Sequence, residues 1–142
     1  FCNKKQTYRN INLFIGYKSH NMADSHILGK SGEDKAAEHL RNLGYTIRHR
    51  NWKSGRTEIN IVAENKDFIV FVEVKTRTND TFVKPAVAVT PQKQRTIIFA
   101  AEIYIRKYGI AKESRFDIIT ILNKGEASDI EHMENAYYST LR

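Results

Sequence analysis

Side chains that could bind a metal ion lie in two neighbouring apolar runs. Residues 57–78 read TEINIVAENKDFIVFVEVKTRT. The runs are rich in β-branched and aromatic residues and flank a short polar segment, which predicts a β-hairpin. Because side chains alternate along a strand, Glu73 and Lys75 share one face of the second strand. Burying either charge alone would be costly, so we expect compensation by each other, by a metal ion or by a ligand.

Asn60 supplies a second oxygen on the first strand. A pairing symmetric about residues 65–66 puts Asn60 opposite Phe71, on the face of Glu73 and diagonal to it. The same register puts Glu58 opposite Glu73. Carboxylate and amide oxygens are ligands that suit Mg²⁺ or Mn²⁺. Two such oxygens converging at this end of the hairpin could therefore hold one of these ions.

A helix is predicted before the hairpin, over residues 31–42. Ser31 is its expected N-cap and Gly44 the residue just past its end. This places Glu33 in the first helical turn. Its carboxylate could simply complement the helix dipole, or it could reach towards the sheet as a metal ligand.

A second helix follows the hairpin, with Thr90 as N-cap, Pro91 in its first turn and Gly109 at its end. Further extended segments are expected over 45–52, over 115–122 and, as an edge strand or a surface segment, over 129–138. The order helix, three strands, helix, strand predicts an α/β domain with a mixed sheet flanked by helices.

The composition favours a basic, single-domain protein. The chain has 142 residues, 41% of them hydrophobic, and 23 Lys and Arg against 16 Asp and Glu, for a net charge of +7. That excess favours polyanions, nucleic acid first, although a generic basic surface is the alternative. The candidate contacts to phosphate are Arg50, Arg56, Arg77 and Lys93.

Residues 1–21 differ from the rest, being basic and weakly patterned, so we expect an N-terminal extension outside the core and a single domain over 22–142. The one cysteine, Cys2, cannot form an internal disulfide. The longest early apolar run is too short for a signal sequence or a membrane span. We therefore expect a cytoplasmic protein with no membrane partner.

Several motifs occur in the order typical of one family. They are Gly32-Glu33, Gly44-Tyr45, Arg50-Asn51-Trp52, Glu58-Ile59, residues 71–77 (FVEVKTR) and Arg115-Phe116-Asp117. In these the chain resembles the YraN-type family of predicted endonucleases, part of the PD-(D/E)xK nuclease superfamily and similar to Holliday-junction resolvases. The resemblance extends from Met22 to about Leu122 and implies a restriction-endonuclease-like core.

The resemblance also implies roles for individual residues. Glu73, the acidic residue of the first strand and the carbonyl of Val74 would bind Mg²⁺ or Mn²⁺. Lys75 would orient the attacking water, and Glu33 would assist from the helix. The chain departs from the family at one of these positions, because Asn60 stands where the family has a metal-binding Asp.

Three functions follow as alternatives. The first is a metal-dependent nuclease that cleaves DNA, including branched or junction DNA. The second is a DNA-binding protein of the same fold whose catalysis is impaired by Asn60. The third is a structural or partner-binding protein with no nucleic-acid role. Cutting of junctions would favour a symmetric homodimer.

Overall fold

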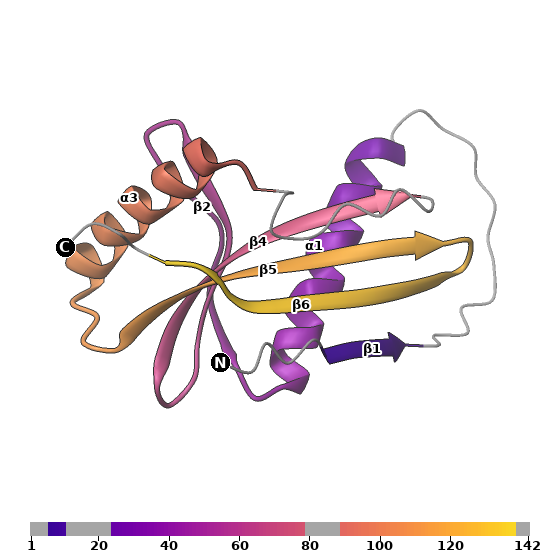
Figure 1. Cartoon of the computed structure of the whole chain (residues 1–142), viewed down its shortest axis with the longest axis horizontal. Coiled ribbons are helices and arrows are strands. Elements are labelled where there is room, and N and C mark those ends of the chain that lie inside the picture. The colour runs from indigo at the N-terminus through magenta and orange to yellow at the C-terminus, as the bar shows by residue number, and fades with distance from the viewer. Residues whose placement is uncertain (1–5, 11–23, 79–88, 139–142) are drawn as a thin grey trace.

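The computed structural model describes residues 6–10, 24–78 and 89–138, with side chains from Gly32 onward. The predicted boundary at Met22 lies outside the described residues. Two helices, α1 (Asp24–Asn42) and α3 (Pro91–Tyr108), accompany a mixed sheet (Figure 1). The predicted α/β class and element order are confirmed.

The sheet has six described strands in the order β1-β6-β5-β4-β3-β2. Neighbouring strands are antiparallel except β4 and β5, which are parallel and joined through α3. The strands are β1 (Gln6–Asn10), β2 (Thr46–Ser54), β3 (Thr57–Glu64), β4 (Phe68–Thr78), β5 (Glu113–Lys124) and β6 (Ala127–Tyr137).

Each face of the sheet is covered by one helix. On one face, buried residues of α3 such as Ile97 and Tyr104 pack with Phe71 and Phe116. On the other, Ala36 and Leu40 of α1 belong to a second buried cluster with strand residues. Figure 1 shows α1 crossing behind the central strands. Burial on both faces explains why β4 is apolar from Phe68 to Val72.

The start of α1 differs from the prediction. The helix begins at Asp24, so Ser31 lies inside it rather than at its N-cap, and Glu33 is not in the first turn. Glycines at positions 29 and 32 interrupt the apolar stripe, which is why the pattern did not indicate the earlier turns. The predicted end is confirmed: Gly44 has a φ of 92°, and the Tyr45 N–H donates to the Leu40 carbonyl at 3.0 Å.

The ends of α3 were predicted correctly. Thr90 is the N-cap, and its hydroxyl accepts a hydrogen bond from the Lys93 N–H at 3.2 Å. Pro91 occupies the first turn, where its missing N–H costs nothing. Gly109 ends the helix in the left-handed region, with a φ of 60°. The cap therefore fixes the backbone position of Lys93 in the first turn of α3.

The register of the β3–β4 hairpin is shifted by two residues from the prediction. Val62 pairs with Phe71 and Glu64 with Ile69. The cause is the turn: the Asn65 side-chain oxygen accepts from the backbone N–H groups of Asp67 and Phe68, at 3.0 and 2.8 Å, so the loop is residues 66–67. A shift of two keeps every side chain on its predicted face.

The C-terminal segment forms strand β6, which lies between β5 and β1. The sequence predicts an edge strand or a surface segment here; the strand is confirmed, but the edge position is wrong because β1 pairs with the other side of β6. Strand β1, which pairs with β6 from Gln6 to Asn10, was not predicted. Within the described residues, β1 and β2 are therefore the edges of the sheet.

Candidate active site

Strands β3 and β4 diverge at the centre of the molecule. Their ladder ends at the pair Ile61 and Val72. Residues 57–59 stay paired with β2, whereas residues 73–78 stay paired with β5. Figure 1 shows the β2–β3 hairpin bending away as β4 continues beside β5. We call this divergence, with Asn60 on β3 and Glu73 on β4, the fork.

Glu73 is the buried acid of the fork, with only 5% of its surface exposed. Its Oε1 lies 3.4 Å from the Lys75 ammonium. Its Oε2 is buried and has no hydrogen-bond partner among the described residues. Such a carboxylate oxygen is rare because leaving it unpaired carries the full cost of its desolvation.

Asn60 faces Glu73 across the fork. Its side-chain oxygen accepts a hydrogen bond from the Val74 N–H at 2.9 Å. The side chain thus takes the place of a backbone acceptor where the ladder ends. The predicted proximity of Asn60, Glu73 and Val74 is present, although the register that was used to predict it was wrong. Glu58 is not opposite Glu73: it lies opposite Lys53 on β2, and their charged groups are 3.5 Å apart.

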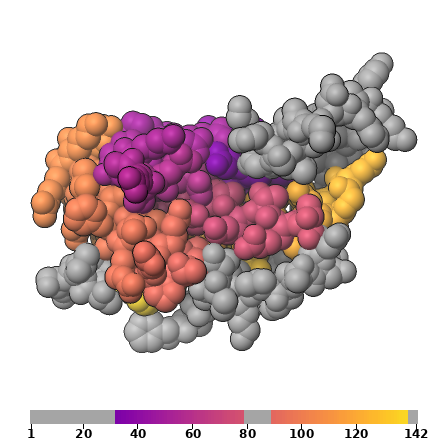
Figure 2. Space-filling view, turned by 90° about the horizontal axis from the view of Figure 1, so that it is seen from above, coloured from indigo at the N-terminus to yellow at the C-terminus, as the bar shows by residue number. Residues whose placement is uncertain are grey.

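Lys93 reaches the same carboxylate from α3. Its ammonium lies 3.8 Å from Glu73 Oε1, the oxygen that also contacts Lys75. In the view from above, the surface of β4 (pink) lies beside the first turns of α3 (salmon) (Figure 2). Lys93 was predicted as a phosphate contact, and its place beside Glu73 was not foreseen. The sequence did contain one signal for an anionic neighbour of Lys93: a cation in the first turn of a helix opposes the helix dipole.

Glu33 extends from α1, which covers the opposite face of the sheet from α3 and Lys93. Gly32 packs against Thr76 of β4 so closely that a Cβ would overlap the Thr76 hydroxyl. Next to it, Glu33 lies 3.7 Å from the guanidinium of Arg50 on β2, and Asp34 lies 2.7 Å from the same group. One turn of α1 therefore contacts β4 through Gly32 and β2 through Glu33 and Asp34, and Arg50 is held in ion pairs.

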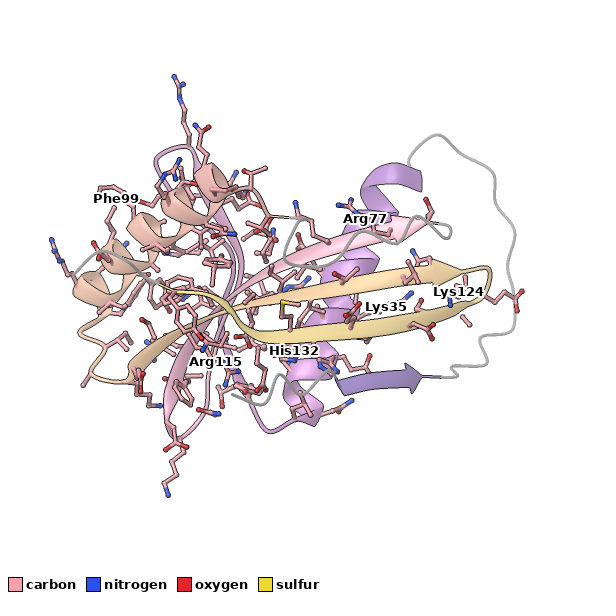
Figure 3. The ribbon with its side chains drawn as sticks, in the orientation of Figure 1. Lys35, Arg77, Phe99, Arg115, Lys124 and His132 are labelled. Carbon is pink, nitrogen blue, oxygen red and sulfur yellow. The ribbon has the colours of Figure 1, made fainter. Side chains whose placement is uncertain are left out.

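The remaining predicted phosphate contacts, Arg77 and Arg56, lie on β4 and in the turn between β2 and β3. Arg77 follows Glu73 and Lys75 on the same face of β4, nearer its end (Figure 3). Arg56 is exposed in the turn between β2 and β3. Trp52 packs against the α3-side core, edge-on to Tyr104 with ring centroids 5.1 Å apart.

The donors at the fork suit a single hard cation. Glu73 Oε2, the Asn60 amide oxygen and the Val74 carbonyl are oxygen ligands of the kind Mg²⁺ and Mn²⁺ prefer. The orphaned Oε2 is the specific feature that such an ion would satisfy. Within the described part of the chain, no group of three or more His, Cys, Asp and Glu is placed to hold a metal ion. The fork therefore offers one full negative charge to a cation.

A separate buried network lies between β5, β6 and α1. Asp117, which is fully buried, accepts two hydrogen bonds from Arg115 at 2.9 and 2.8 Å, and lies 2.8 Å from His132 Nε2. His39 Nε2 lies 3.1 Å from His132 Nδ1. Figure 3 shows Arg115 and His132 near each other on the two strands. Sequence reasoning identified the Arg115-Phe116-Asp117 motif but not its histidine partners.

The Asp117 carboxylate bonds the backbone of β6 as well as the side chains of Arg115 and His132. Asp117 also accepts from the backbone N–H of Asn135 at 3.0 Å, where β6 is irregular and Asn135 has a φ of 52°. Burial alone would raise the pKa of the Asp117 carboxyl, but the bonds from His132 and Arg115 and their charges hold it below its usual value. Burial, and then the charge of His132, lowers the pKa of His39 to about 4.

Comparison with known sequences places the chain in a family. Residues 32–121 match the uncharacterised protein family UPF0102. A UPF0102 protein of Bacteroides fragilis is 46% identical over 120 residues, which cover 84% of this chain and 99% of the relative. UPF0102 proteins of Phocaeicola vulgatus and Flavobacterium psychrophilum are 45% and 38% identical over 117 residues, 82% of this chain and 97% and 98% of the relatives. The chain belongs to the UPF0102, or YraN-type, family.

The two described helices also bear on membrane association. Neither α1 nor α3 combines the length and the apolar character that a membrane-crossing helix requires.

Proposed function

We propose that the chain is a metal-dependent nuclease that cleaves phosphodiester bonds in DNA, with the fork as its active site. The observation that supports this best is the buried Oε2 of Glu73, which lies beside Lys75 and Asn60 and has no hydrogen-bond partner in the described part of the chain. A purely structural ion pair would have no reason to keep one carboxylate oxygen unsatisfied.

Glu73, the Asn60 amide oxygen and the Val74 carbonyl would hold one Mg²⁺ or Mn²⁺. When bound, the ion neutralises charge that develops on the phosphate and makes water more acidic. In hydrolysis, a water oxygen bonds to phosphorus as one ester bond breaks. One water proton is released to solvent and the leaving oxygen takes up a proton. Lys75 holds the attacking water with its ammonium, anchored by Glu73 at 3.4 Å.

The charges around the fork favour a phosphate. One carboxylate, Glu73, lies between two ammonium groups, Lys75 and Lys93. Arg77 continues the positive charge along the same face of β4. With a net charge of +7 over the chain, DNA is the polyanion that fits this surface. Glu33, which pairs with Arg50 on the α1 side, would assist from there, as the resemblance implies.

A second function has its own supporting observation. The oxygen of Asn60 already accepts the Val74 N–H, and Asn lacks the charge of the family's Asp. A chain that binds branched or broken DNA without cutting it efficiently would fit this equally well. Both functions require DNA binding that weakens steeply with salt.

The test is a cleavage assay on duplex, flap and four-way junction DNA with Mg²⁺ or Mn²⁺. The wild-type chain is compared with Asn60→Asp, and Glu73→Gln is the inactive control. We expect Asn60→Asp to cut about 10–100-fold faster than wild type, the usual size of effect for a residue that tunes a metal site. Salt-dependent binding without cleavage by either protein would favour the second function. Neither cleavage nor binding would contradict both.

A further inference from the structure

We propose that Lys93 is a second catalytic residue of the fork, whose ammonium holds a nonbridging oxygen of the phosphate being cleaved. This inference rests on the proposed function and identifies how the site completes its positive charge. Three observations support it: the place of Lys93 relative to Glu73, the helix turn from which it extends, and the charge that Asn60 leaves out.

The first observation is the position of the ammonium. Lys75 and Lys93 approach the same oxygen, Glu73 Oε1, at 3.4 and 3.8 Å. The longer distance exceeds that of a hydrogen bond, so Lys93 is near the carboxylate without being bound tightly to it. Its side chain is 41% exposed, against 28% for Lys75. Lys93 is thus the outer of the two cations, on the side from which DNA would approach.

The second observation concerns α3. Lys93 lies in the first turn, and that turn contains no acidic residue. A cation at this end of a helix is unfavourable because the helix dipole is positive there. The buried Glu73 beside it, with its unpaired Oε2, shows that the same place is a site of polar chemistry. An anionic phosphate between α3 and the fork would interact favourably with both the helix dipole and the Lys93 ammonium, and would offset the repulsion between them.

The third observation is the missing charge. In two-metal nucleases a second cation stabilises the phosphate oxygens as charge develops on them. The fork has one full carboxylate and an amide, which is enough for one ion. The Lys93 ammonium stands beside that carboxylate and can supply the second positive charge without a second metal. Preorganised charges of this kind act on the transition state more than on the bound substrate.

This role gives Lys93 two opposite effects. Its positive charge competes with a metal ion for Glu73, so Lys93→Gln should bind Mn²⁺ several-fold more tightly in the absence of DNA. The same variant should cleave DNA about 10²-fold more slowly in single-turnover assays, the typical loss when one stabilising group is removed. Loss of a residue that only supports the fold would not raise metal affinity. Loss of a residue that only attracts DNA would weaken DNA binding without slowing single-turnover cleavage at saturating DNA.

The experiment measures Mn²⁺ affinity by calorimetry and single-turnover cleavage for the full chain, in the wild-type and Asn60→Asp backgrounds. Lys93→Arg keeps the charge and should recover part of the rate. Lys66→Gln removes one charge from the exposed hairpin turn and is the matched control, expected to change neither quantity.

The outcomes separate the two proposals. Tighter Mn²⁺ binding with slower cleavage by Lys93→Gln supports the role of Lys93. Cleavage at the rate of the Lys66→Gln control overturns it, whatever the metal affinity, and leaves the nuclease proposal standing. If neither background binds Mn²⁺ or cuts DNA, the nuclease proposal fails, and the role of Lys93 is overturned with it.

Discussion

Asn60 accepts a hydrogen bond at the fork, as an aspartate could, but it carries no charge. Its oxygen accepts the Val74 N–H at 2.9 Å, and the carboxylate of an aspartate could accept the same bond. The difference lies in electrostatics. Beside the buried Glu73, a second carboxylate would be repelled in the absence of metal and would strengthen binding in its presence. Under the proposed function, we therefore expect Asn60→Asp to change metal affinity more than folding.

His39 predicts how stability depends on pH. Its pKa is about 4 in the folded chain against 6.5 as the ordinary value. Between these values the unfolded chain binds more protons, so the free energy of unfolding should rise as pH rises through this window. The contribution of His39 to the free energy of unfolding should therefore be lost as pH falls from about 6.5 to about 4. That contribution is about 3 kcal/mol in total. Urea unfolding at pH 7.5 and pH 5 measures the difference.

His39→Gln isolates that effect. The variant cannot titrate, so its stability should change less between the two pH values than that of wild type, even if it is less stable at both. His49→Gln, which changes a histidine bonded to Tyr104 outside the network, is the control and should keep the wild-type dependence. Equal pH dependence in wild type and His39→Gln would contradict the assignment.

The contact between α1 and β4 gives a prediction for these elements. Ala in place of Gly usually stabilises a helix interior by about 0.5–1 kcal/mol. At Gly32, however, a Cβ would overlap the hydroxyl of Thr76. Overpacking of this kind costs about 1–3 kcal/mol, so we expect Gly32→Ala to lower the free energy of unfolding.

A double-mutant cycle checks the cause. In a Thr76→Ala background the overlapping hydroxyl is absent, while the Thr76 Cβ position lies 3.4 Å from the added Cβ. There, Gly32→Ala should be neutral or stabilising in denaturant unfolding. Equal destabilisation in both backgrounds would mean that the close approach of the two elements is not the reason.

The elements themselves were largely predictable because their signals are local. Thr90, Pro91 and Gly109 define α3, and the apolar runs define β3 and β4. The register was not predictable from symmetry, since one side chain, Asn65, sets the loop by its hydrogen bonds to Asp67 and Phe68. The early start of α1 was missed because its first turns lack an apolar stripe.

The site was predictable to the extent that its residues lie on the hairpin. Glu73, Lys75 and Asn60 are within one supersecondary unit, where alternation decides which face each side chain takes. Lys93 and Glu33 come from helices whose placement depends on tertiary packing. The link between His39 and His132 joins residues far apart in the sequence, and no local pattern could indicate it.

At the scale of the whole molecule, the fork lies where the layers meet. The sheet is covered by α1 on one face and α3 on the other, and both helices contribute a residue near the divergence of β3 and β4. Glu33 comes from the α1 side and Lys93 from the α3 side. Metal binding at the fork would join β3 and β4, which supply the proposed ligands, and should therefore stabilise the folded chain.

The most direct measurement is the melting temperature of wild type and Asn60→Asp in EDTA and in several millimolar Mg²⁺. Glu73→Gln serves as the variant that should not respond to the metal. In EDTA, Asn60→Asp should melt below wild type, because its carboxylate faces Glu73. In Mg²⁺ the order should reverse, since a ligand at a hundredfold excess over its Kd stabilises the folded state by about 2.7 kcal/mol. If Asn60→Asp responds to Mg²⁺ no more strongly than wild type, the fork is not a metal site and the nuclease proposal is contradicted.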